Sequence, residues 1–226
     1  MTIRSKLYGA IAVTMAGLAV TAGVGIWGMT RLSDRFDDVQ RAADARALAL
    51  QVKFAVADFN GWQTAYGYDN GESRPIFLSS VAGFRGTLAR AKLELTRPIE
   101  RPLLQEITAA FGDFMRLDRV AWAALQAGRT AQVRRIFLGP EIANFRRAAF
   151  GAERLAQVEA ERASAEEEEF RDARKDALRF LIGASLVAAF LVAILLVTAL
   201  DLARTAERTL ARHSSAENVD DVAGLS

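Results

Sequence analysis

Two long uncharged stretches constrain this chain of 226 residues more than any other feature. They cover residues 7–29 and 180–200. Each exceeds the roughly 20 residues that a helix needs to cross a hydrocarbon core about 30 Å thick. The sequence therefore predicts two transmembrane helices. Both would place residues 31–179 on one side of the membrane, and residues 1–6 and 201–226 on the other.

The first stretch also has features of a secretory signal peptide, because Arg4 and Lys6 precede it. The apolar region of a cleaved signal usually spans only about 7–15 residues, and this one is longer. Tyr8 and Trp27 stand near its two ends, where interfacial aromatic residues are common in membrane helices. An uncleaved anchor is favoured, with cleavage after Ala22 as the alternative.

Charge alone does not decide which side faces the cytoplasm. Basic residues near the membrane favour the cytoplasmic side, but they flank both ends of both stretches here. The rule also weakens for loops longer than about 60 residues, and residues 31–179 form a much longer one. The orientation stays open at this point.

Composition excludes most kinds of catalytic and metal-binding chemistry. The chain has no Cys and one His, His213, so disulfides, thiolate metal sites and histidine-based catalysis are excluded from its main body. No phosphate-binding G-x-x-x-x-G-K motif and no H-E-x-x-H motif occur. The formal charge of +2 gives no argument for nucleic acid. We expect no catalytic residues, no cofactor and no metal site.

Residues 31–179 are predicted to be helical almost throughout. Apolar residues recur every three or four positions on four segments, 31–68, 75–96, 102–127 and 140–179. Breaker residues separate them, notably 69–73, and a short segment leads to Gly139-Pro140. The predicted fold is all-α, with an up-down-up-down four-helix bundle between the two transmembrane helices. The apolar stripes are Leu48, Val52, Ala55, Phe59, Trp62 and Tyr66; Phe77, Val81, Phe84, Leu88, Ala91 and Leu95; Leu104, Ile107, Phe111, Phe114, Leu117, Ala121 and Leu125; and Ile142, Phe145, Ala149, Ala152, Leu155 and Val158.

The first and last of these helices are longer than the middle two, which predicts a two-helix stalk next to the membrane. Counting from the membrane puts Arg41 level with Glu169, and Arg46 within one turn of Glu166. We therefore expect Arg41 and Arg46 to face the acidic stretch 159–169, within one protomer or across a dimer. The four consecutive Glu residues at 166–169 point about 100° apart on a helix, so they do not predict a metal site.

Candidate ligand-binding residues gather where the first helix ends. Asp58 and four neighbours there are expected to meet arginines from three other segments. Aromatic rings beside guanidinium groups could hold a carboxylate-bearing small molecule through stacking and bidentate hydrogen bonds. The alternative is that Trp62 and Tyr66 belong to the core and the arginines form a solvated face. The predicted binding residues are Asn60, Trp62, Gln63, Tyr66, Arg74, Arg134 and Arg146, with Arg135 and Arg147 nearby.

The opening MTIRSKLYGAIAVTMAGLAVTAGVGIWGMTRLSD resembles the N-terminus of bacterial methyl-accepting chemotaxis proteins. The segment NGWQTAY, residues 60–66, is similar to actinobacterial members, and the likeness continues to about residue 200. The resemblance implies a cytoplasmic N-terminus, an extracytoplasmic ligand-sensing bundle, a homodimer in the bacterial inner membrane, and signalling by small helix displacements.

The chain also departs from that family. A HAMP linker with a characteristic proline would follow the second transmembrane helix, yet residues 201–226 contain no proline. We expect residues 201–212 to continue as helix and residues 214–226 to lack regular structure. The resulting hypothesis is a chemoreceptor-like sensor truncated before its output domain, which is a truncated relative, a gene remnant or a subunit that works through another chemoreceptor. Alone, it is not expected to support chemotactic signalling. The alternative is a membrane-anchored interaction or structural protein without a ligand.

Overall fold

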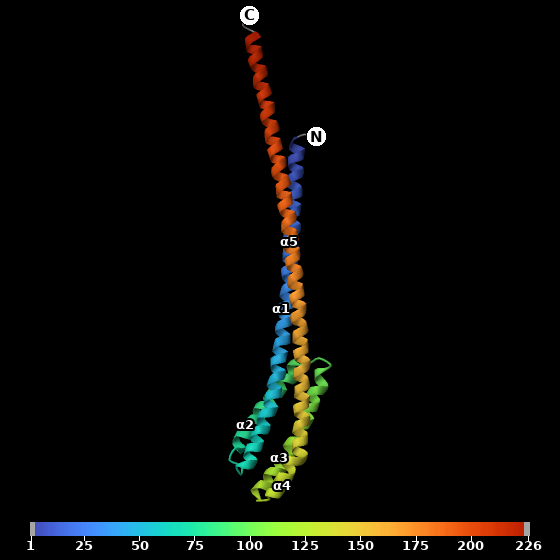
Figure 1. Ribbon diagram of the computed structural model, residues 1–226, viewed down its shortest axis with the longest axis vertical. Helices are drawn as coiled ribbons and strands as arrows, with labels where there is room; N and C mark the ends of the chain where they lie inside the picture. Colours follow the sequence, from blue (N-terminus) through green and yellow to red (C-terminus); the bar gives the residue numbers. More distant parts are fainter. Residues whose placement is uncertain (1–2, 224–226) are drawn as a thin grey trace. The chain divides into compact units, whose positions relative to one another are not determined.

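The described structure is entirely helical, which confirms the all-α class. The computed structural model describes the backbone of residues 3–223 and the side chains of residues 8–9, 11–201 and 203–205, and this part contains no strand. The predicted segment 1–6 and most of the tail 201–226, including the His213 side chain, lie outside the described side chains. The elements are α1 (Ile3–Tyr68), α2 (Arg74–Glu94), α3 (Glu100–Gln126), α4 (Thr130–Ile136), a π-helical turn η1 (Phe137–Glu141) and α5 (Ile142–Ala223) (Figure 1).

Local sequence signals place most helix ends. Helix α1 ends at Tyr68 as predicted, because Asn70 and Gly71 follow with φ of 55° and 103°, which a helix cannot continue. Pro75 lies in the first turn of α2, where its missing N–H costs no hydrogen bond. The expectation of irregular structure from residue 214 was wrong over its described part, since α5 continues to Ala223. No Gly or Pro interrupts the chain between Gly183 and Gly224.

The chain divides into two compact units. The first comprises Met1–Asp34 and Arg171–Ser226, and the second comprises Arg35–Phe170, somewhat shorter than the predicted domain of residues 31–179. Helices α1 and α5 each carry a stretch that is long and apolar enough to cross a membrane by length and composition, and these stretches bury none of their residues in the structure. In the first unit, a Cβ added to Gly17 would collide with the Leu191 side chain, so this glycine permits a close helix contact.

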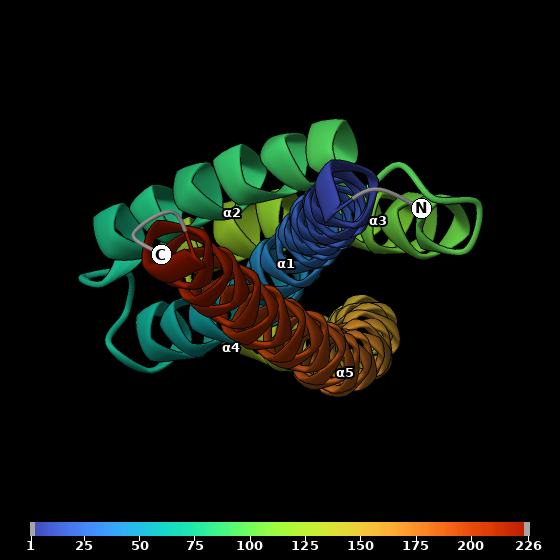
Figure 2. The same cartoon turned by 90° about the horizontal axis from the view of Figure 1, so that it is seen from above.

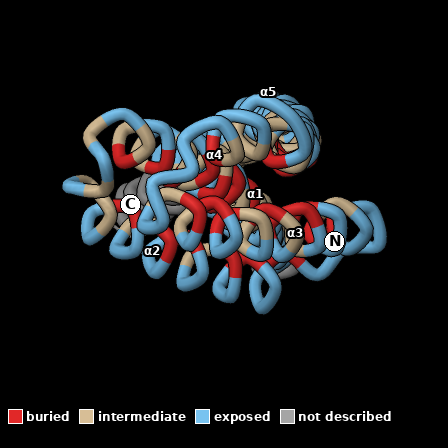
Figure 3. Tube along the Cα trace, turned by 90° about the horizontal axis from the view of Figure 1, so that it is seen from below, coloured by how far each residue is buried: buried red, intermediate tan, exposed pale blue. Residues whose placement is uncertain are grey.

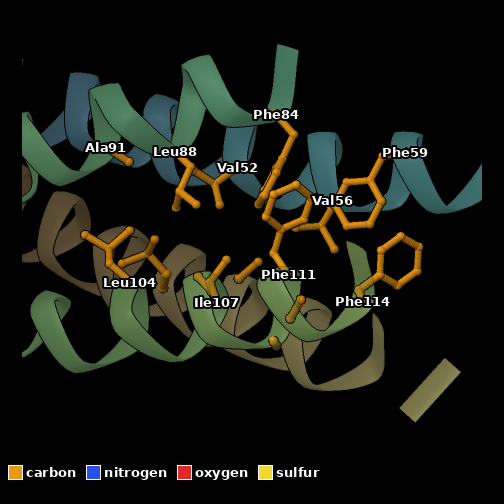
Figure 4. Packing of buried hydrophobic residues seen from close by; sticks show 14 of the residues in the cluster. Val52, Val56, Phe59, Phe84, Leu88, Ala91, Leu104, Ile107, Phe111 and Phe114 are labelled. Atoms are coloured by element: carbon orange, nitrogen blue, oxygen red, sulfur yellow. The ribbon is translucent and has the colours of Figure 1, made fainter. Parts of the chain in front are cut away.

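The second unit has one hydrophobic core, to which α1, α2, α3 and α5 all contribute. Figures 1 and 2 show the course of these helices from two directions. The centre of the core is Phe59 of α1, whose ring lies 5.0 Å from those of Phe84 and Phe114 and 5.4 Å from that of Phe111, all edge-on (Figure 4). Edge-to-face packing at these distances is favourable beyond the area that it buries. Buried residues line the inner faces of the helices, and exposed residues line the outer turns (Figure 3).

The predicted apolar stripes of α2 and α3 form this core. In α5, the buried face is rotated about the helix axis relative to the predicted stripe. All six predicted residues of α2 and its end are buried, from Phe77 to Leu95. Helix α5 buries Ala148, Ala152 and Leu155, while Phe145 and Ala149 are only half-buried. The small residues on this face allow α3 to approach closely, and a Cβ on Gly151 would lie 2.9 Å from Ile107.

Helices α1 and α5 pair at the far end of this unit in a register shifted from the predicted one. Arg35 pairs with Glu169 at 2.7 Å, and the Phe36 and Phe170 rings lie 6.1 Å apart. Arg41 donates to Asp38 of its own helix at 2.6 Å. The prediction set Arg41 level with Glu169, so the observed register differs by six residues, which is nearly two helical turns.

The other residues of the predicted stalk pairing lie close to this region. Arg46 and Glu167 both line a cavity of about 420 Å³ between α1 and α5, whose walls are mostly small apolar side chains. Glu166 is half-buried. Helix α1 thus presents one arginine to the acidic stretch by direct pairing, Arg35, and a second, Arg46, across a cavity.

Candidate ligand-binding site

The second unit contains a cavity of about 910 Å³ where α1 ends. Its walls come from the last two turns of α1, the turn that follows, α4 and η1. Three residues that the sequence predicted for ligand binding line it, namely Asn60, Gln63 and Arg134. The full lining is Asn60, Gln63, Thr64, Gly67, Tyr68, Asn70, Leu125, Thr130, Ala131, Val133, Arg134, Phe137, Leu138, Glu141 and Ile142.

A tight turn after α1 brings α2 beside the end of α1. The Asp69 carboxylate accepts hydrogen bonds from the Gly71 N–H at 3.1 Å, the Ser73 N–H at 3.0 Å and the Ser73 hydroxyl at 2.5 Å. These bonds, chiefly that of the Ser73 hydroxyl, lower the pKa of Asp69. A side chain at Gly71 would lie 2.8 Å from the Trp122 ring, so both the positive φ and the space require glycine here. The turn sets Arg74 opposite Tyr66.

The π-helical turn η1 forms the other side of the cavity. Gly139 departs from helical geometry, with φ −112° and ψ −105°, and Pro140 has no N–H to donate. The chain therefore kinks at Gly139 between α4 and α5, and this kink sets the direction in which α5 begins. Glu141 follows Pro140 and is buried. Phe137 packs on Gly67, where a Cβ would collide with its ring.

Beside the cavity, Arg74 and Tyr66 both bind the carboxylate of Asp118. Arg74 donates two hydrogen bonds to it, at 2.6 and 2.7 Å, and the Tyr66 hydroxyl donates a third to Oδ1. Asp118 is fully buried on α3. The sequence predicted that Arg74 and an aromatic residue would hold the carboxylate of a ligand; in the structure they hold a carboxylate of the protein itself.

Aromatic rings enclose the Arg74 guanidinium on the sides that Asp118 leaves open. Its central carbon lies 4.7 Å from the centre of the Tyr66 ring, 4.8 Å from that of Phe77 and 4.9 Å from that of Trp122. Burial works against the charged form of Arg74, but the hydrogen bonds and negative charge of Asp118 prevail and raise its pKa. Burial and the Asp118 charge also raise the pKa of Tyr66, so its hydroxyl stays protonated. This cluster is a structural anchor between α1, α2 and α3.

Two buried polar side chains of the cavity wall, Gln63 and Glu141, lie beside each other. Gln63 is 4 % exposed and Glu141 is 1 % exposed. Neither carboxyl oxygen of Glu141, nor Nε2 of Gln63, makes a hydrogen bond of normal geometry to any described residue. Burial is the main cause that raises the pKa of Glu141 to about 8; the Asp118 charge adds to the shift, while the nearby Gln63 amide and Arg74 oppose it. Buried polar groups are rarely left unsatisfied, so these two side chains are the feature of the cavity wall that most needs an explanation.

The remaining predicted residues lie elsewhere. The Trp62 indole N–H donates to Asp58 at 3.2 Å on the surface of α1. Arg134 is exposed at the cavity, and Arg135 and Arg146 are exposed as well. Arg147 lies 3.7 Å from Asp113. The structure thus brings Asn60, Gln63 and Arg134 to one cavity, places Tyr66 and Arg74 in the adjoining anchor, and leaves Trp62 and Arg146 outside both.

A second group of buried acids lies at the turn between α2 and α3. Glu100 and Glu159 are fully buried, and Arg97 and Arg162 approach them at 3.4–3.9 Å. Burial and the neighbouring Glu100 raise the pKa of Glu159. Glu100 also accepts a hydrogen bond from the Arg97 N–H at 2.8 Å, within the turn that leads into α3. We interpret this group as a structural connection from this turn to α5.

Sequence reasoning missed Asp118 and Glu141, the two acids that define the site. Asp118 carries a recognisable signal, because it continues the apolar stripe of Phe111 and Phe114 at helical spacing. Glu141 follows Gly139-Pro140, and nothing in the sequence indicates that this break becomes a π turn.

Comparison with known proteins adds no further evidence to this geometry. No family model, curated protein or solved structure matches the sequence. Within the described residues, no three His, Cys, Asp or Glu side chains are grouped as metal ligands would be.

Proposed function

We propose that this chain is a membrane-anchored sensor that binds a small molecule in the cavity and transmits binding by displacement of α1 and α5. One observation carries the proposal. The cavity holds two buried, unpartnered polar side chains, Gln63 and Glu141, and it is walled by α1 and by the π turn that leads directly into α5. Helices α1 and α5 are also the two that carry the long apolar stretches.

The proposed membrane arrangement follows the sequence prediction. Residues 7–29 and 180–200 cross a bacterial inner membrane, and residues 31–179 form an extracytoplasmic four-helix bundle with up-down-up-down topology. The unburied apolar side chains of α1 and α5 support the crossing, since exposed apolar surface of this length is unfavourable in water. The resemblance to methyl-accepting chemotaxis proteins supports the orientation and a homodimer.

Transmission requires that a ligand bind two arrangements of the helices with different affinity. The cavity meets this need in principle, because Asn60, Gln63 and Thr64 lie on α1 whereas Ile142 begins α5. A ligand that contacts both walls favours one spacing of these walls over another. Each helix is continuous from the cavity to its apolar stretch, so a shift at the cavity moves a membrane-spanning segment.

Ligand binding is tested by thermal unfolding of the full chain in detergent, against a panel of organic acids, amino acids and amines. We expect at least one class to raise the Tm by several degrees. Ala131→Phe, which fills the cavity mouth, should abolish the shift, and Ala109→Phe, at an exposed position of α3, should preserve it. If no compound shifts the wild-type Tm, the chain is an anchored structural protein and the proposal fails.

Topology is tested with single cysteines, which the absence of native Cys makes simple. A membrane-impermeant maleimide applied to intact cells should label Ala89→Cys in the second unit. It should label Ser5→Cys and Ser215→Cys only after the membrane is opened, because these residues lie on the cytoplasmic side in the proposed orientation. The reverse pattern would invert the orientation, and labelling of all three in intact cells would contradict a membrane protein.

A further inference from the structure

The cavity offers an incoming molecule a buried carboxyl group without a positively charged partner. The charged and titratable groups around Glu141 are Tyr66 of α1, Arg74 of α2, Asp118 of α3 and Arg134 of α4. Arg74 already shares two hydrogen bonds with Asp118, and its charge is balanced there. Tyr66 donates to the same carboxylate and Arg134 is exposed, so neither neutralises Glu141.

The rest of the wall combines polar residues, among them Asn60, Thr64 and Thr130, with an apolar part. Leu125, Val133, Phe137, Leu138 and Ile142 contribute side chains to it. Gln63 is the one other buried polar residue of the lining, and its amide lies beside Glu141 and favours the ionised carboxylate. A carboxylate in such surroundings binds a cation well, because each removes the charge that makes the other costly to bury.

We propose that the ligand of this cavity is a small organic amine, with its ammonium group on the Glu141 carboxylate and its apolar body against Val133, Phe137 and Ile142. This assignment rests on the proposed function, since it names the ligand class of the same cavity. A free carboxylate ligand fits less well, because Arg134 is the only positively charged residue of the lining and its side chain is exposed. A bare metal ion lacks the further carboxylates that it requires.

Amine binding at this site must displace a proton. The pKa of Glu141 is about 8 in the empty cavity, so the carboxyl group is mostly protonated at pH 7, whereas a simple alkylamine stays charged to about pH 10. The ammonium binds the ionised form. Affinity therefore increases about tenfold for each pH unit as the pH is raised towards 8, and it levels off above pH 8.

The test is calorimetry on the full chain in detergent with cyclohexylamine, cyclohexanol and cyclohexanecarboxylate, three probes of nearly equal shape. We expect cyclohexylamine to bind about tenfold more tightly at pH 7 than at pH 6. Titrations in buffers of different ionisation enthalpy should show about one proton released per amine bound at pH 7. Glu141→Gln should abolish amine binding, and Glu106→Gln, an exposed acid on α3, should leave it unchanged.

The outcomes separate this inference from the function on which it rests. Suppose that cyclohexanol or the carboxylate binds the wild-type chain but not Ala131→Phe, and that the amine does not bind. The cavity is then a ligand site and the amine assignment fails. Amine affinity that stays constant or falls between pH 6 and pH 7 also overturns the assignment. If none of the three probes binds, and no other compound raises the Tm, both proposals fail together.

Discussion

Replacing Asp118 by alanine is expected to lower the free energy of unfolding of the second unit by about 3–5 kcal/mol. Asp118 is fully buried and accepts hydrogen bonds from Arg74 and Tyr66. Its loss leaves a guanidinium that is only 11 % exposed without a counter-charge, among aromatic rings. Denaturant unfolding of the full chain in detergent measures the change, with Trp27 and Trp62 replaced by phenylalanine in all variants so that the fluorescence reports on Trp122, whose ring contacts Arg74.

Asp113→Ala is the matched control on the same helix. Asp113 also pairs with arginine, with Arg116 at 2.9 Å, but both side chains are exposed. Its removal should cost less than about 1 kcal/mol. Exchanging both members of the buried pair, Asp118→Ala with Arg74→Leu, should recover part of the loss, since no buried charge then stays unpaired. Equal effects of Asp118→Ala and Asp113→Ala would contradict the anchoring role.

Glu141→Gln is expected to change how stability depends on pH. The pKa of Glu141 rises from 4.5 to about 8 on folding, so the folded state holds this proton more tightly than the unfolded chain. The contribution of the group to stability is fully present below pH 4.5 and is lost as pH rises through about 8. Relative to Glu141→Gln, the wild-type chain should therefore lose roughly 3–5 kcal/mol between pH 4.5 and pH 9.

The quantity to compare is the slope of the free energy of unfolding with pH. A buried glutamine adds a cost of missing hydrogen bonds, but this cost does not change with pH. Thermal unfolding of both proteins at intervals from pH 5 to pH 9 gives that slope. Glu159 also has a raised pKa, but it is present in both proteins and cancels in the difference. The Glu106→Gln variant should run parallel to wild type. A constant difference between wild type and Glu141→Gln across this range would show that Glu141 is not buried as an acid.

The sequence was most informative where a local rule decides the backbone. Asn70 and Gly71 end α1 at Tyr68, as predicted, because both need positive φ. The apolar spacing of residues 77–95 and 104–114 identified the buried faces of α2 and α3, because a helix repeats every 3.6 residues. These signals lie within a few residues of the structure that they determine.

Pairwise contacts between helices were harder to predict. Counting residues outward from the two predicted membrane helices placed Arg41 opposite Glu169. In the structure, Arg35 lies there instead. Such a count treats both helices as straight and equally deep, whereas side-chain packing, such as that of Phe36 on Phe170, sets the register. The resulting error of nearly two turns changes the partner of a charged side chain.

The candidate site shows the same division. The sequence by itself determined that Asn60, Gln63 and Tyr66 share one end of a helix, because they are close neighbours on α1. It also indicated that arginine and aromatic residues would surround a carboxylate. Only the tertiary structure decided that this carboxylate is Asp118, and that Glu141 is the buried acid without a partner. Burial and charge pairing depend on residues from four different elements at once, and spacing along one helix carries no information about which of them meet.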